Sequence, residues 1–167
     1  MAHHIRGITE ADWPQVVALE WEAYAGTSLT EGEAALRSRA SAGICFVLDL
    51  GGRIVGYVLA LPYPRFGCPD LTRPEPAVHR SANLHLHDLV VTAPLRRRGL
   101  GTRLVRHLTD VAVTRGFETM SLIAVAGKES FWRAGGYLPD QGAPLPAGYG
   151  AGAVYMSTRL AAARKAS

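Results

Sequence analysis

Several signals of common protein classes are missing from this chain of 167 residues. No apolar run is long enough to span a bilayer, and the first residues, MAHHIRG, have no apolar core like that of a signal peptide. We therefore expect a cytoplasmic protein without a membrane partner. Low-complexity tracts are also missing and nearly half of the residues are hydrophobic, so we expect one globular domain over residues 1–167.

Cysteine is scarce, since the chain contains only Cys45 and Cys68. They have neither the CxxC spacing of a zinc site nor the density of a disulfide framework, so we expect two free thiols. No Gly-Lys-Ser or Gly-Lys-Thr occurs, which excludes a Walker-type loop. Lysine is rare as well, and the basic residues behind the net charge of +4 are almost all arginine. The planar guanidinium group of arginine suits an anionic cofactor.

Nucleic acid would also suit the charge, but the arginines are scattered except at Arg96, Arg97 and Arg98. No basic stripe with interleaved aromatic residues is present, so we expect no nucleic-acid partner. The three arginines lie within Leu84–Leu108, where an apolar run leads through a turn at Ala93–Pro94 into a basic glycine loop and a helical pattern. This order predicts a strand, a loop and the start of a helix.

The loop and the start of this helix are suited to bind phosphate. The first N–H groups of a helix have no partner within it, and the helix dipole adds positive charge there. Glycine lacks a Cβ, so phosphate can approach the backbone closely. A dinucleotide fingerprint would need a third glycine where the chain has Leu104. We predict a pyrophosphate site formed by Arg96, Arg97, Arg98, Gly99, Leu100, Gly101 and Thr102.

The patterns of apolar residues along the whole chain predict a mixed α/β sheet. Thr9 or Asp12 could cap the first helix, and Thr30 with Glu33 predicts a capping box for the second. Gly51-Gly52 predicts a hairpin turn between two strands. The expected strands are 5–9, 44–50, 53–61, 84–92, 119–125, one from residue 137 and 154–160, and the expected helices are about 12–24, 30–41, 102–115 and 128–134.

A long proline-rich loop, residues 62–83, precedes the central strand. Loops of this length inside a compact domain are usually functional or mobile. Its position makes it a candidate wall of a substrate site, although an ordered surface loop without a ligand is an equal alternative.

Three motifs resemble those of the GNAT acyltransferases. Arg96-Arg-Arg-Gly-Leu-Gly101 matches the [QR]-x-x-G-x-[GA] loop that binds the pyrophosphate of acetyl-CoA, and Phe131–Tyr137 is similar to an element of the family's last helix. Leu84–Val91, LHLHDLVV, resembles a strand of the arylalkylamine N-acetyltransferases. The resemblance implies a GNAT fold with a mixed, mostly antiparallel sheet and helices on both faces. It also implies acetyl-CoA as cosubstrate, bound further by Leu89, Val90, Val91, Phe131 and Trp132.

Two histidines and a carboxylate in this strand are candidates for the catalytic base. Strand side chains alternate, so we expect His85 and His87 on one face and Asp88 on the other. Imidazole, with an ordinary pKa of about 6.5, can take a proton from an alkylammonium near neutral pH, as the resemblance also implies for the pair. The alternative is that one or both histidines pack in the core. Asp88 is the rival base, although burial would have to raise its pKa. No third ligand at useful spacing supports a metal site.

Trp132 departs from the family pattern, which usually has a tyrosine there as the acid for the departing thiolate. An indole N–H is not a usable acid. Either the thiolate leaves without a protein acid, or Ser130 or Tyr137 donates a proton through water. Trp132 itself is expected to pack against the helix and the cofactor.

From these observations we expect an N-acetyltransferase that moves an acetyl group from acetyl-CoA to a small primary amine. The reaction would be direct attack in a ternary complex, with a backbone N–H near Val90 stabilising the oxyanion. The acceptor could be an arylalkylamine, a polyamine, an antibiotic or a protein N-terminus or lysine, and the sequence does not choose. A CoA-binding regulatory module without turnover and a nucleic-acid binder are the alternatives of other classes, and a homodimer is left open.

Overall fold

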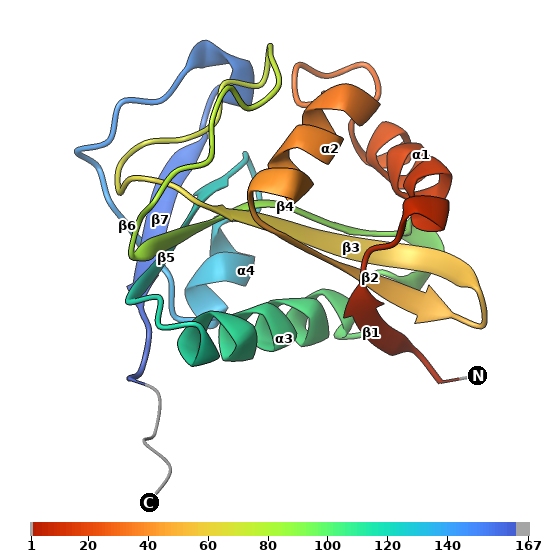
Figure 1. Cartoon of the computed structure of the whole chain (residues 1–167). Coiled ribbons are helices and arrows are strands. Elements are labelled where there is room, and N and C mark those ends of the chain that lie inside the picture. Colours follow the sequence, from red (N-terminus) through yellow and green to blue (C-terminus); the bar gives the residue numbers. More distant parts are fainter. Residues whose placement is uncertain (1, 163–167) are drawn as a thin grey trace, which may run out of the picture.

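One seven-stranded sheet forms the centre of the computed structural model, which describes residues 2–162 (Figure 1). The strand order is β1-β2-β3-β4-β5-β7-β6, and β4 with β5 is the parallel pair, while the other neighbours are antiparallel. The strands are β1 His4–Gly7, β2 Ile44–Leu50, β3 Arg53–Pro62, β4 Asn83–Val91, β5 Thr119–Ala124, β6 Leu138–Pro139 and β7 Val154–Arg159. The predicted mixed, mostly antiparallel sheet is confirmed.

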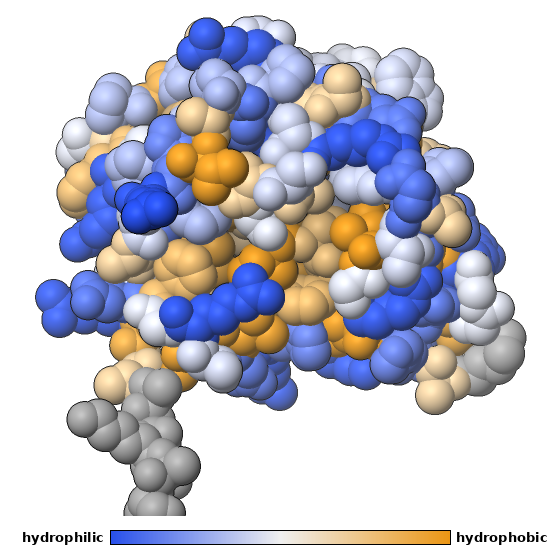
Figure 2. Space-filling model, viewed as in Figure 1, coloured by the Kyte–Doolittle hydropathy of each residue, from blue (hydrophilic) through white to orange (hydrophobic). Residues whose placement is uncertain are grey.

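Helices cover both faces of the sheet, as predicted, with α1 and α2 on one face and α3 and α4 on the other (Figure 1). The α-helices are α1 Trp13–Tyr24, α2 Glu33–Ala42, α3 Leu100–Thr114 and α4 Glu129–Ala134, and short 3-10 helices are η1 Glu10–Asp12, η2 Ala93–Leu95 and η3 Ala147–Tyr149. Figure 2 shows that hydrophobic residues gather in the middle of one face of the molecule, with hydrophilic residues around them.

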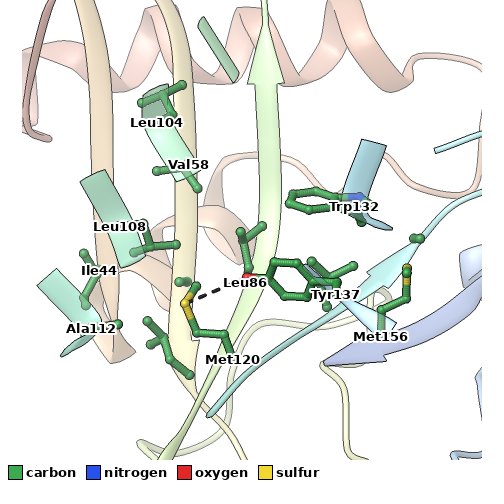
Figure 3. Packing of buried hydrophobic residues seen from close by; sticks show 14 of the residues in the cluster. Ile44, Val58, Leu86, Leu104, Leu108, Ala112, Met120, Trp132, Tyr137 and Met156 are labelled. Carbon is green, nitrogen blue, oxygen red and sulfur yellow. Dashed lines mark hydrogen bonds between the residues drawn. The ribbon is translucent and has the colours of Figure 1, made fainter. Parts of the chain in front are cut away.

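The apolar stripe of α3 explains how this helix is held against the sheet. Leu104, Leu108 and Ala112 recur at a spacing of four, and all three are fully buried. They pack against Val58 of β3 and the other core residues shown in Figure 3. The N-terminus of α3 is therefore fixed beside β4, which positions the predicted pyrophosphate loop.

The predicted hairpin between β2 and β3 is present. Gly51 and Gly52 have φ of 61° and 92°, which are dihedrals that other residues rarely adopt. The predicted capping box of the second helix is wrong. The Thr30 hydroxyl donates to Glu20 Oε1 at 2.9 Å, and α2 begins only at Glu33, after Gly32, with no side chain as its cap. The buried carboxylate of Glu20 competes successfully for the groups that would have capped the helix.

Two irregularities of β4 shape the region beside the predicted pyrophosphate loop. Its parallel pairing with β5 ends at Leu86–Leu122, although β4 continues to Val91. Opposite β3, Leu59 pairs with Asp88 and Ala60 with Leu86, so His87 is an extra residue that forms a β-bulge. The bulge interrupts the alternation of side chains, and Asp88 turns to the face that carries α1. The prediction that Asp88 lies on the opposite face from the histidines is therefore wrong.

Candidate active site

A cleft of about 550 Å³ opens where β4 and β5 separate. One end lies against the start of α3 and against α4, and the other lies beneath the segment between α1 and α2. Of the predicted cofactor-binding residues, those that line it are Leu89, Val91, Arg96, Arg97, Gly99, Leu100, Gly101, Thr102, Phe131 and Trp132.

The start of α3 has the features of a phosphate site. Gly99, the residue before the helix, has φ of 76°, and no side chain caps this end. The first N–H groups of α3 are therefore free of side-chain acceptors and lie beside the cleft. Arg97 has φ of 63°, an uncommon value for a residue other than glycine, and its side chain is exposed at the cleft. These groups fit a pyrophosphate.

Gly101 lines the cleft beside two of its apolar side chains. A Cβ added to it would lie 3.7 Å from Leu89 Cδ2 and 3.8 Å from Phe131 Cζ, both of which line the cleft. Beyond Leu86, the edge of β4 that faces β5 has no strand partner, so its peptide groups are available to an extended arm such as pantetheine. One of them, the Val91 carbonyl, accepts from Arg96 Nε at 3.0 Å.

Two predicted cofactor residues do not line the cleft. The Val90 side chain is buried against α1 and β3 on the other face of the sheet, because the bulge sets its direction. Its own carbonyl faces Gly56 of β3, so the peptide groups at the open strand edge are those of Leu89 and Val91. Arg98 is exposed outside the cleft lining, so its charge acts from a distance at most.

His87 lies at the other end of the cleft with an unusual set of contacts. Its side chain is only 2% exposed, and Nε2 lies 2.6 Å from Glu31 Oε2. Its other ring nitrogen, Nδ1, is buried and has no hydrogen-bond partner within residues 2–162. Buried polar atoms usually have partners, so an unsatisfied one on a residue that lines a cleft points to a missing ligand.

His85 has different surroundings, although its ring centroid is 6.5 Å from that of His87. It is 1% exposed, does not line the cleft, and shares a hydrogen bond of 2.9 Å between Nδ1 and Ser121 Oγ. Burial lowers the pKa of His85 to about 3, so the ring stays neutral at physiological pH. The contacts favour the alternative that this histidine packs in the core.

Asp88 lines the cleft but its oxygens are engaged. The phenol of Tyr24 donates to Oδ1 at 2.8 Å and the phenol of Tyr57 donates to Oδ2. Burial raises the pKa of this carboxyl to about 6. The carboxylate therefore fastens α1 and β3 to β4, and the pKa shift that a catalytic Asp88 would need is present.

Trp132 packs against its own helix as expected: the residue is 8% exposed, and its ring lies edge-on to Phe131 and Tyr137. The Tyr137 hydroxyl points into the core toward Met120 Sδ, 3.9 Å away (Figure 3). Burial raises the pKa of Tyr137, which makes it a weaker acid. Ser130 is exposed and does not line the cleft. Neither Ser130 nor Tyr137 is therefore placed to protonate a thiolate in the cleft.

Several cleft residues carry no sequence motif and were missed by sequence reasoning. Glu31 fell within a predicted helix, although it belongs to the segment before α2. The Ser28 hydroxyl donates to the Gly148 carbonyl at 2.7 Å, and the Tyr149 hydroxyl donates to the Pro69 carbonyl at 2.6 Å. These bonds join three distant segments around the cleft, and none is visible as a local pattern. The missed residues are Tyr24, Leu29, Glu31, Leu71, Leu86, Leu95, Leu122, Ile123, Val125, Lys128 and Tyr149.

Within residues 2–162, no group of three or more His, Cys, Asp or Glu side chains is arranged to hold a metal ion. In the same part of the chain, every helix is too short or too polar to cross a membrane.

Comparisons with known proteins agree with this geometry. The acetyltransferase (GNAT) family profile matches residues 13–134. The loading GNATL domain of CurA from Lyngbya majuscula has a similar structure, with a TM-score of 0.77 and 16% identity over 95% of this chain and 98% of that one. The ribosomal-protein-S18-alanine N-acetyltransferase from Escherichia coli has a TM-score of 0.68 and 18% identity, over 98% of this chain and 97% of that one.

A third similar structure is the N-acetylglutamate synthase from Neisseria gonorrhoeae, complexed with coenzyme A and N-acetyl-glutamate. Its TM-score is 0.73 and its identity 18%, over 96% of this chain and 36% of that one. No curated protein sequence matches the chain. The comparisons lend no support to the narrower resemblance to arylalkylamine N-acetyltransferases. Because the family profile matches more than half of the residues and the cleft fits acetyl-CoA, the chain belongs to the GNAT family of acetyl-CoA-dependent N-acetyltransferases.

Proposed function

We propose that this enzyme acetylates the primary amine of a small molecule by direct attack in a ternary complex. The observation that carries the proposal is that His87, which lines the cleft, has a buried Nδ1 without a partner and Glu31 on its other ring nitrogen. An alkylammonium has no lone pair and must lose a proton before it can attack. His87 Nδ1 accepts that proton, directly or through water.

Bound acetyl-CoA supplies the acetyl group as a thioester. The first turn of α3, with Arg96 and Arg97, would hold its pyrophosphate, and the open edge of β4 at Leu89–Val91 would hold the pantetheine arm. A backbone N–H near Val90 stabilises the negative charge that develops on the acetyl oxygen. A thiol with an ordinary pKa of about 8.5 leaves as a tolerable anion, so Trp132 need not supply a proton.

His85 and Asp88, the other two candidates for the base, receive supporting roles in this proposal. The neutral, hydrogen-bonded His85 supports the strand behind His87. Asp88 keeps Tyr24 at the wall of the cleft through the hydrogen bond from its phenol. A direct role for Asp88 in proton transfer would require it to release that phenol first.

The acceptor end of the cleft suits a small molecule with an apolar body. Leu29, Leu71 and Tyr149 contribute apolar surface close to the polar groups of His87 and Glu31. The segment between α1 and α2 is bonded to residues 147–149, which are bonded in turn to the 62–83 loop. Three joined segments leave less room for an extended peptide than separate ones would.

A protein N-terminus is the second candidate acceptor. The observation in its favour is the similarity of the fold to that of the ribosomal-protein-S18-alanine N-acetyltransferase from Escherichia coli. Such an acceptor would have to enter between the joined segments, so at least one of the two joining hydrogen bonds would open.

The proposal is tested by incubating the chain with acetyl-CoA and a panel of small primary amines, while CoA release and acetylated product are measured. We expect turnover, and His87→Ala should lower kcat/KM at least about a hundredfold, because general bases contribute about 10² to 10⁴. Acetyl-CoA affinity should not change. His107→Ala is the matched control, since this histidine packs on Phe46 away from the cleft.

Undiminished turnover in His87→Ala would contradict the role of His87 as the base. Tight CoA binding without release of CoA in the presence of any amine would instead favour a regulatory module without turnover.

A further inference from the structure

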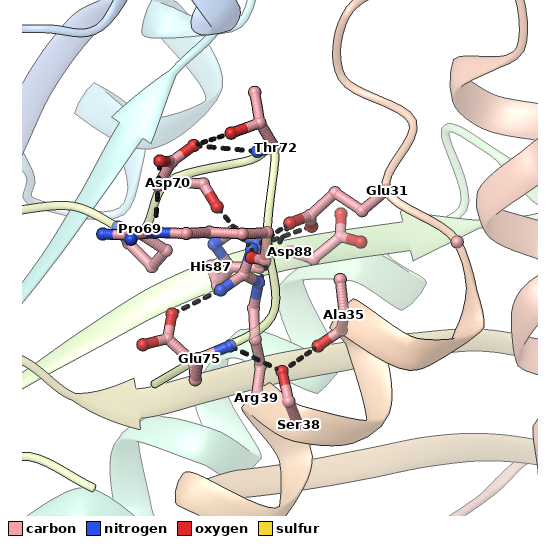
Figure 4. Close-up of polar contacts among 12 residues, drawn as sticks. Glu31, Ala35, Ser38, Arg39, Pro69, Asp70, Thr72, Glu75, His87 and Asp88 are labelled. Atoms are coloured by element: carbon pink, nitrogen blue, oxygen red, sulfur yellow. Dashed lines mark hydrogen bonds and ion pairs between the residues drawn. The ribbon is translucent and has the colours of Figure 1, made fainter. Parts of the chain in front are cut away.

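Arg39, a residue of α2, is fully buried and surrounded by acceptors (Figure 4). Its Nε donates to Glu31 Oε1 at 2.9 Å, and its terminal nitrogens pair with Glu31 and Glu75. Nη2 also donates to the carbonyl of Asp70 at 3.0 Å and to that of Arg73 at 3.2 Å. Arg39 thus joins α2, the segment before it and the 62–83 loop.

These contacts form a continuous series that ends in the cleft. Glu75 pairs with Arg39, Arg39 with Glu31 Oε1, and Glu31 Oε2 with His87 Nε2. The side chains of Glu75, Arg39, Glu31 and His87 are each at most 4% exposed. Water does not screen charges so deeply buried, and a buried charge is costly unless it is paired.

The backbone around Glu31 is also fixed. The N–H groups of Glu31 and Gly32 each donate to the buried carboxylate of Glu20 at 3.1 Å. The Glu31 carboxylate therefore has little freedom to turn, since one oxygen is bonded to Arg39 and the other to His87.

The protonation of Glu31 decides which tautomer His87 adopts. Burial alone would raise the pKa of Glu31, but the contacts with His87 and Arg39 outweigh it, so the pKa lies below its ordinary value. An ionised Glu31 has no proton to donate, and the shared proton must reside on His87 Nε2. In the neutral ring Nδ1 then carries a lone pair, and this is the buried ring nitrogen without a hydrogen-bond partner within residues 2–162.

We propose that Arg39, supported by Glu75 of the 62–83 loop, is a positioning residue that holds Glu31 against His87 and so directs the unprotonated Nδ1 into the cleft. The catalytic consequence rests on the proposed function, whereas the assignment of the tautomer does not. The 62–83 loop then belongs to the catalytic assembly, because it supplies Glu75 and two of the carbonyl acceptors of Arg39.

The tautomer is tested without any substrate by two-bond ¹H–¹⁵N NMR of protein labelled with ¹⁵N-histidine, at a pH where the ring is neutral. The wild-type His87 should carry its proton on Nε2. Glu31→Gln, nearly isosteric, can donate from its amide to Nε2, and should transfer the ring proton to Nδ1. Glu33→Gln is the matched control, because this exposed carboxylate pairs with Arg37 at the surface. A wild-type ring protonated on Nδ1 would overturn the proposal.

The role of Arg39 is tested by the pH–rate profile for any amine that the enzyme acetylates. Arg39→Met removes a positive charge and should move the acidic limb to higher pH, while Glu75→Gln removes a negative charge and should move it to lower pH. Both should lower kcat at least about tenfold with little change in the KM for acetyl-CoA. If Arg39 and Glu75 had only a structural role, the two variants would not shift the acidic limb in opposite directions.

The pH dependence of His87 is set by the titratable or charged groups around it, which are Tyr24, Glu31, Arg39, Glu75, His85, Asp88 and Tyr149.

Arg39→Met leaves two carboxylates buried without their cation and can fail to fold. In that case the role of the Glu75–Arg39 pair is tested by Glu75→Gln alone, because glutamine keeps an acceptor for Arg39. A folded Glu75→Gln enzyme with the wild-type limb and the wild-type His87 tautomer population would overturn the proposal. If no amine is acetylated, the proposed function fails, and the NMR comparison of Arg39 and Glu75 variants still tests the positioning of the ring.

Discussion

Gly101 is the residue at which the cofactor site can be tested most simply. Its added Cβ would make ordinary van der Waals contacts of 3.7–4.0 Å with Leu89, Phe131 and Val91, so the fold tolerates alanine. Valine adds two methyl groups in the cleft itself. Gly101→Val should therefore raise the Kd of acetyl-CoA at least about tenfold, which is about 1.4 kcal/mol. Calorimetric titration measures this, and Gly101→Ala is the control for folding. Unchanged affinity in folded Gly101→Val would place the cofactor elsewhere.

Asp88 makes the folded protein less stable as pH rises. Its folded pKa, raised from 3.8 to about 6, lies above the unfolded value. The folded state is therefore favoured by the protonated carboxyl at low pH, and this contribution is lost as pH rises through about 6. This difference between the unfolded pKa of 3.8 and the folded pKa of about 6 corresponds to about 3 kcal/mol.

An asparagine at position 88 does not titrate, so the Asp88→Asn protein does not lose this unfolding free energy as pH rises. Between about pH 3 and pH 7, the wild type should lose about 3 kcal/mol of unfolding free energy relative to Asp88→Asn. Urea denaturation of both proteins across this range measures the difference. A difference between the two that stays constant with pH would contradict the burial of a titrating carboxyl at this site.

At the scale of elements, the junction of α2 and β2 tolerates only glycine. A Cβ on Gly43 would lie 2.0 Å from the Ala60 carbonyl oxygen and 2.6 Å from Leu61 Cα, both of them backbone atoms of β3. Gly43→Ala should cost about 3 kcal/mol or more, since the strand itself would have to move. Gly7→Ala is the control, because nothing lies within 4 Å of its Cβ position. Similar denaturation midpoints for the two variants would show that the junction is looser than described.

Elements with a local signal were predicted well from sequence. The stripe of α3 and the Gly51-Gly52 hairpin each depend on residues that are close in the chain, and both are present. The start of α3 at Leu100, two residues before the expected Thr102, is an ordinary boundary error. The β-bulge at His87 could not be predicted, because it is defined by the register with β3 and not by β4 alone.

The acceptor end of the site was the part that sequence reasoning missed. The HLH motif drew attention to both histidines, but only the bulge and the partners distinguish His87 from His85. Arg39 is a charged residue of a short helix, a pattern typical of a solvent-exposed face, yet it is fully buried. Its partners Glu31 and Glu75 are 8 and 36 residues away in the chain, and no periodic pattern connects them.

In the whole molecule, the two faces of the sheet contribute different groups to one cleft. In the proposed function, the side that carries α3 would supply the start of a helix for the anionic cofactor, and the side that carries α1 and α2 would supply the carboxylates that position His87. Figure 1 shows the two pairs of helices on opposite sides of the sheet. The separation of β4 from β5 beyond Leu86 lets one cleft reach both. Under the proposed function, this arrangement lets acetyl-CoA and the acceptor amine bind side by side, as direct transfer requires.

A competition experiment decides whether the cleft accepts small amines in preference to peptides. A single reaction contains acetyl-CoA, a set of small primary amines and a set of short peptides with free N-termini at equal concentrations, and mass spectrometry measures which acceptors gain an acetyl group. Because three joined segments enclose the acceptor end, small amines should be acetylated at least about tenfold faster than peptides, a difference of about 1.4 kcal/mol in barrier. Preferential acetylation of the peptides would contradict the account.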